Sequence, residues 1–235
     1  MLWVRSLLFV TVFYVWSVFM CLACLPALAL PRSVVREATR LWARGVIVML
    51  RTVCGVRVEV RGREHMPVGR ALIAAKHQCM LDVFAQFAWM PDASFVMRKE
   101  LMRIPVFSWY ARKNRMVVID REGGARALRE LVAEGRERLK APRQLLIFPE
   151  AHRNEPGVAG TYHPGVAALY RELDLPLHLV ATNSGVHWPA HGFLRRPGVI
   201  VFEFLPPLPP DLKRAEFMRR MESGIEEASR RLLSL

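Results

Sequence analysis

The chain is short of cysteine and of acidic residues. Its four cysteines form no recognisable pattern, since Cys21 and Cys24 lie inside an apolar run and Cys54 and Cys79 are isolated. This spacing argues against a metal finger and a disulfide framework, and it favours a reduced, cytosol-facing domain. There are 21 Asp and Glu against 34 Lys and Arg, so the formal net charge is +13. An excess of this size predicts an anionic partner: nucleic acid, an acidic membrane surface or a phosphorylated substrate.

Several common catalytic motifs are also missing. The sequence has no G-x-S-x-G, no G-x-G-x-x-G, no G-x4-G-K-S/T and no H-E-x-x-H. An acyl-enzyme serine, a dinucleotide and a catalytic zinc are therefore unsupported. The 235 residues also lack an internal repeat, a low-complexity segment and an interdomain linker. This length predicts one ordinary α/β domain plus an appendage.

The appendage begins with a long uncharged run. Leu7–Leu30 contains no charged residue over 24 positions, which is long enough for a helix to cross a hydrocarbon core of about 30 Å. Arginines follow this run from Arg32 onward, so the positive-inside bias predicts that its C-terminal side faces the cytoplasm. The alternative is a cleaved signal peptide, because Ala27–Ala29 is typical of a cleavage site. Signal h-regions span about 7–15 residues. The uncharged run here is longer, and its length favours the membrane anchor.

A second helical segment follows Pro26 and Pro31, which interrupt the run. Between residues 34 and 53 arginines recur at spacings of four and seven, and apolar residues occupy the other face. This pattern predicts a basic amphipathic helix that lies against an anionic interface. The two segments are also compatible with a helical hairpin that dips into one leaflet, and the sequence leaves both arrangements open. Residues 1–54 are accordingly predicted to be membrane-anchoring helical segments.

Residues 55–235 have the pattern of a single α/β domain. Apolar runs predict strands at Val56–Val60, Ala71–Ala75, Phe95–Met97, Met116–Ile119, Gln144–Phe148, Leu177–Ala181 and Val199–Phe204. Helical patterns occupy residues 81–89, 101–112, 125–139, 164–173 and 211–233. Strands that alternate with helices predict a mostly parallel sheet flanked by helices, preceded here by the N-terminal membrane-associated helix pair. Residues 206–210 are predicted to be a stiff proline turn.

One pair of residues has the spacing of a general base and its partner. His77 directly follows the strand predicted at 71–75, and Asp82 comes five residues later. Residues five apart on one helix point about 140° apart. The pair can therefore meet if His77 lies in the turn and Asp82 in the first turn of the next helix. The carboxylate would then orient the imidazole and leave its second nitrogen free to accept a proton.

Other polar residues follow the neighbouring predicted strands at the same point. Carboxyl ends of parallel strands share one edge, where ligands bind in open sheets. Arginine and lysine at this edge would bind phosphate, and a base beside them suits deprotonation of a hydroxyl on a phosphorylated substrate. The residues expected to converge with His77 are Lys99, Arg121, Glu150 and Arg153.

Four ordered blocks strengthen this interpretation. The first is the His-x4-Asp that starts at His77, and the second is a hydrophobic run that ends in Asp120-Arg121. The third, Phe148–Arg153, has the sequence Phe-Pro-Glu-Ala-His-Arg, and the fourth is the apolar strand Leu175–Val180 after a proline. In order and spacing these blocks resemble the 1-acylglycerol-3-phosphate acyltransferases of phospholipid synthesis, in which an N-terminal membrane helix pair is also common.

The resemblance implies a reaction and a set of roles. A fatty acyl chain would pass from acyl-CoA or acyl-carrier protein directly to the sn-2 hydroxyl of lysophosphatidate, giving phosphatidate with no acyl-enzyme, no cofactor and no metal. His77 would be the general base and Asp82 its orienting partner. The partners would be the lipid acceptor, the acyl donor and an anionic membrane surface, with no nucleic acid. The resemblance also assigns substrate binding to Lys99, Arg121, Glu150 and Arg153.

Two departures from the family pattern leave alternatives open. In the third block Ala151 replaces glycine and His152 replaces threonine, and in the fourth Leu179 replaces a proline. If the backbone at residue 151 needs φ > 0, alanine would be strained there. A same-fold acyltransferase for glycerol-3-phosphate or another lysolipid is therefore the nearest alternative. A catalytically impaired lipid-binding protein is the second, and a nucleic-acid binder the third, against which the membrane segment argues.

Overall fold

Seven strands form one sheet in the order β1-β7-β6-β2-β5-β3-β4. The computed structural model describes residues 1–234, and of Arg121 it describes the main chain only. The strands are β1 (Val56–Arg61), β2 (Ala71–Ala75), β3 (Ala93–Arg98), β4 (Val117–Ile119), β5 (Gln144–Ile147), β6 (Leu177–Thr182) and β7 (Gly198–Leu208). Strands β6, β2, β5, β3 and β4 are parallel, while β7 runs antiparallel to β6 and parallel to β1. The predicted mostly parallel sheet is confirmed.

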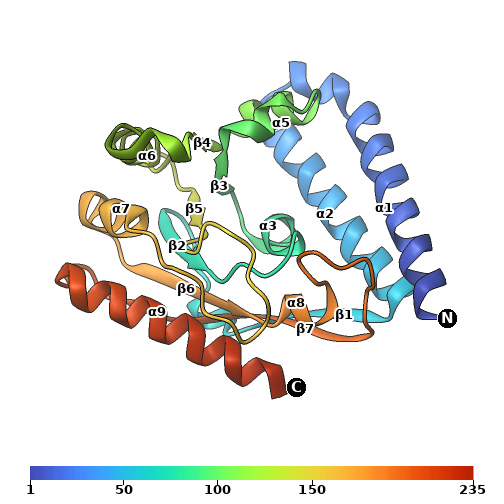
Figure 1. Ribbon diagram of the computed structural model, residues 1–235. Helices are drawn as coiled ribbons and strands as arrows, with labels where there is room; N and C mark the ends of the chain where they lie inside the picture. Colours follow the sequence, from blue (N-terminus) through green and yellow to red (C-terminus); the bar gives the residue numbers. More distant parts are fainter. Residues whose placement is uncertain (235) are drawn as a thin grey trace.

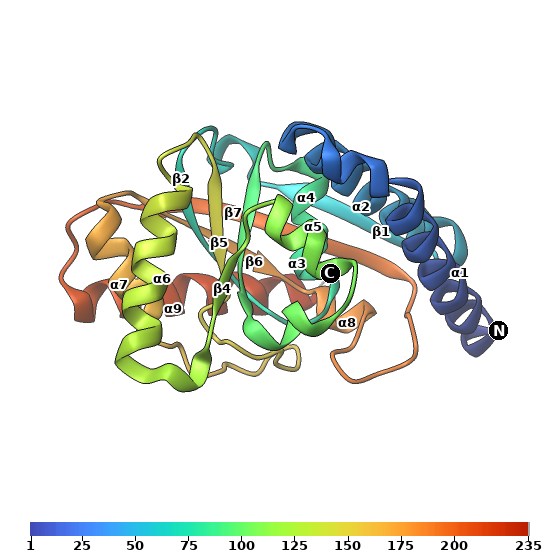
Figure 2. The same ribbon diagram turned by 90° about the horizontal axis from the view of Figure 1, so that it is seen from above.

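Helices cover both faces of this sheet (Figures 1 and 2). They are α1 (Leu2–Ala23), α2 (Arg32–Cys54), α3 (Leu81–Phe84), α4 (Gln86–Trp89), α5 (Phe107–Lys113), α6 (Gly124–Arg138), α7 (Gly165–Leu173), α8 (Ser184–His187) and α9 (Arg214–Arg231). Short 3-10 turns are η1 (Leu25–Ala29), η2 (Arg63–His65), η3 (Lys99–Arg103), η4 (Arg121–Gly123) and η5 (Leu232–Ser234). The sequence predicts most of these helices, but not α8, and the helix predicted over 81–89 is two short helices.

Strand β2 shows why the central strands carry unbroken apolar runs. All five of its residues are buried. Leu72 and Ala74 pack into the core beneath α6, α7 and α9, whereas Ile73 and Ala75 pack into the core beneath α2 to α5. Since successive side chains point to opposite faces and both faces are covered, apolar residues are needed at every position. Such a strand is a rigid base for whatever follows its carboxyl end.

The proline segment near the C-terminus differs from its prediction. Residues 206–208 continue β7 rather than forming a turn, and Leu208 pairs with Leu177 across an irregular register. Strand β1 pairs with β7 only as far as Glu203. Beyond that residue one side of β7 has no neighbouring strand in the described sheet, so prolines without an N–H are tolerated there.

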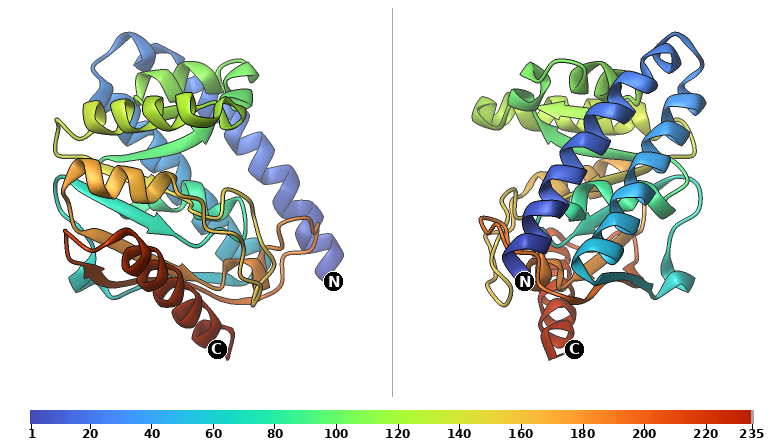
Figure 3. Two further views of the ribbon diagram at one scale, coloured as in Figure 1. Left: turned by 60° about the vertical axis from the view of Figure 1, so that its left-hand side comes forward. Right: turned by 90° about the vertical axis from the view of Figure 1, so that its right-hand side faces the viewer.

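The first two helices form an antiparallel pair joined by η1. Trp16 Nε1 donates to the Trp42 carbonyl (3.1 Å), and Trp42 Nε1 donates to Ser17 Oγ (3.1 Å). Phe9 and Phe13 of α1 are buried against the domain core. The opposite face of α1 is apolar and largely exposed. Figure 3 shows α1 on the outside of the molecule, beside α2. Within residues 1–234, α1 is the only helix that is long and apolar enough to cross a membrane.

Most arginines of α2 contact the α/β domain rather than an external anionic surface. The sequence predicts the arginines at 36, 40, 44 and 51 against an anionic interface, but the structure places Arg36, Arg40 and Arg44 against residues 88–92 of the α/β domain and leaves Arg51 exposed. Arg32 forms a two-point ion pair with Asp92 (2.7 and 2.5 Å). Arg40 donates to the Met90 carbonyl (2.9 Å) and Arg44 to the Ala88 carbonyl. The carbonyls at the end of α4 and one buried carboxylate therefore attract the guanidinium groups inward.

Gly45 permits the close approach of α1 and α2. A β-carbon at this position would lie 2.6 Å from the Trp16 ring. We predict that Gly45→Val lowers the free energy of unfolding by about 1–3 kcal/mol, the usual cost of overpacking. Thermal unfolding in non-ionic detergent measures the change. In a Trp16→Ala background the same substitution should cost much less, and an equal cost in both backgrounds would show that the ring contact is not the cause.

Candidate active site

The carboxyl ends of the five parallel strands each carry a polar residue, and the sequence singles out four of these five. His77 follows β2, Glu150 follows β5 and Lys99 follows β3. Arg121 begins η4 just after β4, and Ser184 opens α8 just after β6. Because these strands are parallel, all five residues lie along one edge of the sheet. The order β6-β2-β5-β3-β4 places β2 near the middle of this edge.

His77 and Asp82 meet as their spacing predicts. His77 lies in the turn after β2, and Asp82 lies in the first turn of α3. The imidazole Nδ1 is 3.2 Å from Asp82 Oδ2. An ionised carboxylate can only accept, so Nδ1 carries the proton and Nε2 is the nitrogen available as a base. Whether His77 and Asp82 act in catalysis stays a prediction.

The Asp82 carboxylate is fixed by a set of donors. Its Oδ2 accepts the main-chain N–H groups of Gln78 (2.6 Å) and Cys79 (2.7 Å), and its Oδ1 accepts the Ser184 hydroxyl (2.5 Å). The Cys79 thiol also donates to Oδ1 (3.5 Å). Burial, together with the nearby Asp82 charge, raises the pKa of the Cys79 thiol well above its usual range. The thiol therefore remains a neutral donor, and the side chain of Asp82 is 1% exposed.

The His77 ring is held on its other side by stacking. Its centroid lies 4.2 Å from that of Phe148, with an interplanar angle of 24°. Phe148 directly follows β5, the strand that neighbours β2. The His77 side chain is 15% exposed. A ring fixed by an aromatic face and a carboxylate, with partial exposure, is pre-organised to move a proton between bound groups.

A buried ion network lies directly beneath this pair. Lys76 Nζ contacts Glu150 Oε1 (2.7 Å), Glu226 Oε1 of α9 (2.6 Å) and the Val158 carbonyl (3.0 Å). The Tyr162 hydroxyl donates to Glu226 (2.9 Å), and burial with the nearby Glu226 charge raises the pKa of Tyr162. These contacts connect the end of β2, the loop after β5 and the C-terminal helix.

Glu150 belongs to this network. Its Oε2 accepts the main-chain N–H of His77 (3.1 Å). Its Oε1 accepts from Lys76, from Asn154 Nδ2 (2.9 Å) and from the Gly160 N–H (3.1 Å). The side chain is fully buried. Glu150 thus fixes the backbone at His77 and the loop that follows, and it shapes the site from beneath. Direct contact with an acceptor stays a prediction.

The cations expected at the site occupy different parts of the edge. Lys99 is exposed and forms an ion pair with Asp120 at the end of β4; that hydrogen bond raises the pKa of Lys99 and lowers that of Asp120. Arg153 is exposed in the loop after β5, with Nη1 3.4 Å from the Ala190 carbonyl. Asn154 beside it donates its main-chain N–H to the His77 carbonyl (3.0 Å), so this loop contacts the main chain of His77. The Arg121 side chain lies outside the described part of the structure, and its role stays a prediction.

Sequence reasoning assigns no role to three residues that the structure places around the pair. Ser184 ends an apolar strand, which is a weak signal. Lys76 is a charged residue adjoining the buried run 71–75, and this contrast is the signal that would have found it. Glu226 adjoins the apolar stripe of α9, where a buried carboxylate requires a partner. Its partner is 150 residues away in sequence, so only the fold reveals it. No metal-binding group of three or more His, Cys, Asp or Glu occurs among residues 1–234 as described.

Ala151 has the positive φ that would strain an alanine at a position where the family has glycine. Its φ is 59°, in the left-handed region. That conformation costs a non-glycine residue about 1–2 kcal/mol. Its N–H donates to the Phe148 carbonyl (3.0 Å), so the turn after β5 imposes the angle. The substituted position is therefore strained next to the residue that stacks on His77.

This strain predicts a stabilising substitution. We expect Ala151→Gly to raise the free energy of unfolding by up to about 1 kcal/mol, because relief of φ strain exceeds the entropy that glycine adds to the unfolded chain. Ala159 in the same loop has no positive φ and is exposed. Ala159→Gly is the matched control and should be neutral or slightly destabilising. Equal effects at both positions, measured by thermal unfolding, would contradict strain at residue 151.

The ion network predicts a second contrast. Lys76→Met leaves two buried carboxylates without their cation, and we expect a loss of about 3–5 kcal/mol in the free energy of unfolding. Glu226→Gln keeps the Lys76–Glu150 pair and weakens one contact, so about 1 kcal/mol is expected. Denaturant unfolding of both variants tests this difference. If Glu226→Gln lowers the free energy of unfolding as much as Lys76→Met does, then Lys76 is not the group that stabilises both carboxylates.

The comparisons with known proteins agree with this geometry. A family model described as "Acyltransferase" matches residues 57–183. A 1-acyl-sn-glycerol-3-phosphate acyltransferase of Pseudomonas aeruginosa is 35% identical over 189 residues, covering 80% of this chain and 72% of that protein. One from Limnanthes alba is 26% identical, over 67% of this chain and 56% of its own length.

A solved structure gives the same fold. The 1-acyl-sn-glycerophosphate acyltransferase PlsC from Thermotoga maritima superposes with a TM-score of 0.82 at 20% identity, covering 100% of this chain and 99% of that one. At this identity the likeness concerns the fold. The family match and the P. aeruginosa relative carry the assignment: the chain belongs to the 1-acyl-sn-glycerol-3-phosphate acyltransferase family.

Proposed function

We propose that the protein transfers a fatty acyl chain from an acyl thioester to the sn-2 hydroxyl of lysophosphatidate, producing phosphatidate for phospholipid biosynthesis. The observation that carries this proposal is the Nδ1 contact of His77 with a buried Asp82, which leaves Nε2 as a base. The names of the relatives agree with an acyltransferase that acts on such an acceptor. Acyl-CoA and acyl-carrier protein both supply the required thioester, and the proposal covers either donor.

In the proposed reaction His77 moves one proton. Its Nε2 accepts the proton of the sn-2 hydroxyl as that oxygen attacks the thioester carbonyl carbon. The imidazolium is stabilised by the negative charge of Asp82 on Nδ1. When the C–S bond of the tetrahedral intermediate breaks, the imidazolium returns the proton to the departing sulfur. The products are the ester and a free thiol, and the base is regenerated without a cofactor or a metal.

The acceptor's phosphate is proposed to bind along the same edge. Arg153 lies in the loop that contacts the His77 carbonyl through Asn154, and it is exposed. Lys99 and Arg121 follow β3 and β4, two and three strands from β2, which is on the order of 10–15 Å. Long side chains can extend toward His77 across this distance. Guanidinium forks match phosphate oxygens, so the two arginines are the proposed main contacts, with Lys99 beside them.

The first 54 residues are proposed to attach the site to a membrane, and residues 55–235 to form the acyltransferase domain. The outer face of α1 is apolar over its whole length, with Trp3, Val4, Leu7 and Leu8 more than half exposed. An apolar surface of this extent is covered by lipid when one is present. We propose an inner-membrane location with the catalytic domain facing the cytoplasm, where lysophosphatidate reaches the domain from the leaflet.

The proposed base is tested by substitution and product analysis. His77→Ala should lower turnover by about 10²–10⁴-fold while leaving thermal unfolding unchanged, because general-base catalysis contributes that range. Asp82→Asn should also lose most activity, since the imidazolium loses its counter-charge. Mass spectrometry of the products from lysophosphatidate and acyl-CoA identifies the reaction. Retention of more than about a tenth of wild-type turnover by His77→Ala would remove it from this role.

The acceptor contacts are tested by comparing two reactions. Arg121→Ala and Arg153→Ala should each weaken the use of lysophosphatidate by about 10–150-fold, because a charge-assisted hydrogen bond is worth roughly 1.5–3 kcal/mol. Arg121→Lys and Arg153→Lys should be more active than the alanine variants but less active than the wild type, because lysine lacks the planar guanidinium fork. Slow hydrolysis of the thioester by water should remain nearly unchanged. If both reactions fall together, these arginines serve the fold or the acyl donor.

A further inference from the structure

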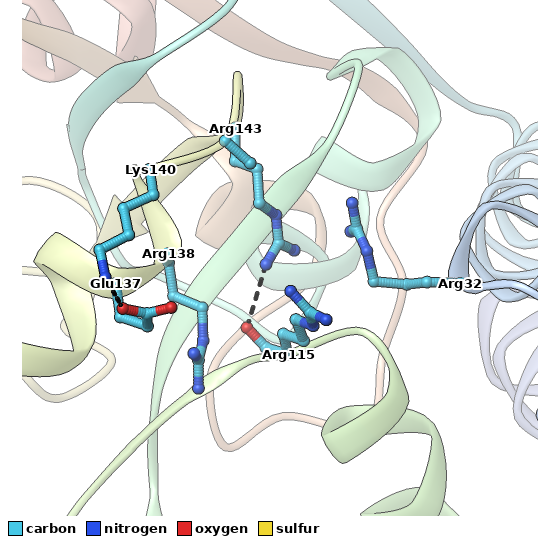
Figure 4. Close-up of a pocket in the computed structure, with 7 residues that line it drawn as sticks. Arg32, Arg115, Glu137, Arg138, Lys140 and Arg143 are labelled. Atoms are coloured by element: carbon cyan, nitrogen blue, oxygen red, sulfur yellow. Dashed lines mark hydrogen bonds and ion pairs between the residues drawn. The ribbon is translucent and has the colours of Figure 1, made fainter.

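A second group of cations lies at the other edge of the sheet, where the parallel strands begin. Arg143 directly precedes β5, Arg115 lies two residues before β4, and Arg32 opens α2. Arg138 ends α6, and Lys140 follows it. Together they line a pocket of about 200 Å³ whose charged residues are Arg32, Arg115, Arg138, Lys140, Arg143 and Glu137 (Figure 4). Five cations thus surround the space with one lining carboxylate, Glu137, which pairs with Lys140, while Arg138 pairs with Glu134 of α6.

Three of the guanidinium groups point into the same space. Figure 4 shows those of Arg32, Arg115 and Arg143 directed toward one another from α2, from the segment before β4 and from the start of β5. Among the described residues one carboxylate contacts them: Asp92, which pairs with Arg32 and lies 3.2 Å from Arg143 Nε. One negative charge beneath three positive ones leaves the pocket with a net positive potential.

Arg143 is the buried cation of this pocket. Its side chain is 2% exposed, and its Nη2 donates to the Asn114 carbonyl (2.7 Å). The pKa of Arg143 is lowered to about 10, chiefly by burial; Asp92 opposes this shift, and the charges of Arg32 and Arg138 act in the same direction as burial. A cation whose charged form is disfavoured by its neighbours is stabilised when an anion binds beside it.

Arg115 is held in position by its backbone. Its φ is 55°, which is unusual for a residue other than glycine. Its carbonyl accepts the Ser94 hydroxyl (3.0 Å) and Arg143 Nη1 (3.3 Å), and its N–H donates to the Arg112 carbonyl. Over the described residues no hydrogen bond or ion pair involves its guanidinium. This left-handed residue follows the end of α5, as is common at helix C-termini, and it fixes the point from which the exposed Arg115 side chain extends.

We propose that this pocket binds a phosphate group. Phosphate presents several acceptor oxygens that match the exposed guanidinium fork of Arg115, and the positive charges of Arg32 and Arg143, which are held by Asp92 and by main-chain carbonyls, lie beside it. The site is separate from the acyl-transfer residues, because Arg143 and Asp92 adjoin the amino ends of β5 and β3 while His77 lies beyond the carboxyl end of β2. The phosphate can be free or part of a phospholipid headgroup. Leu30 and Val34, on either side of Arg32, are 48% and 39% exposed, so an apolar surface adjoins the pocket.

The test uses the full chain in non-ionic detergent and two probes. Isothermal titration with inorganic phosphate, against chloride at equal ionic strength, measures the free anion. Micelles that contain phosphatidylglycerol or phosphatidylcholine, compared by tryptophan fluorescence, measure the headgroup. The main variant is Arg115→Asn with Arg138→Gln, in which asparagine tolerates the left-handed backbone. Arg112→Gln with Arg129→Gln removes the same charge from exposed positions outside the pocket.

We expect saturable binding of at least one probe to the wild type, and binding at least about tenfold weaker to the main variant, since it loses charge-assisted contacts. The control pair should bind as the wild type does. Arg153→Ala should also bind normally, which separates this pocket from the proposed acceptor site. Thermal unfolding of every variant, together with acyl transfer by the pocket variant and the control pair, confirms that the variants are folded, and Arg115→Asn alone serves if the double variant is not.

The two probes also identify the source of the phosphate. Binding of inorganic phosphate supports a site for the free anion, and a response to phosphatidylglycerol alone supports a headgroup site. Equal weakening by the main and control variants would mean that net charge alone attracts the anion, and it would overturn the proposal. So would the absence of saturable binding of either probe, because the cations would then serve only Asp92 and the main-chain carbonyls.

Discussion

The candidate active site depends on one buried cation. Lys76 Nζ joins Glu150 of the loop after β5 to Glu226 of α9, and both carboxylates are largely or fully removed from water. An ammonium in this environment is stable only with such partners, so the three segments must assemble together. Because Lys76 directly precedes His77, and Glu150 accepts the His77 N–H, the same contacts fix the main chain of the base. Positioning of the base is therefore a property of the whole domain.

The two edges of the sheet carry different electrostatic arrangements. At the carboxyl edge two carboxylates each have a close partner: Asp82 accepts from the His77 imidazole, and Asp120 pairs with Lys99. At the amino edge Asp92 is shared by several arginines, one of which opens α2. That sharing attaches the helical hairpin to the α/β domain. It also leaves positive charge around the pocket, so docking of the hairpin and the proposed phosphate site depend on the same carboxylate.

Much of the fold follows from periodicity in the sequence. The apolar runs predict all seven strands, because a sheet covered on both faces needs apolar residues at successive positions, as β2 shows. Residues 206–208 are the exception, since prolines indicate a turn unless the neighbouring strand is known to have ended. The arginine spacing of α2 predicts an amphipathic helix correctly, but cannot identify what the charged face contacts. A carboxylate 60 residues away, Asp92, decided that.

By itself the sequence determined most of the elements, the family and the meeting of His77 with Asp82, because these depend on local spacing and on the order of four blocks. It also indicated strain at Ala151, since a missing glycine is visible in the block. Only the tertiary structure decided which carboxylates Lys76 bridges, that Ser184 completes the shell of Asp82, and that three arginines converge around one pocket. Those contacts join residues far apart in the chain, and electrostatic pairing over such separations is set by the packing of elements rather than by any periodic pattern.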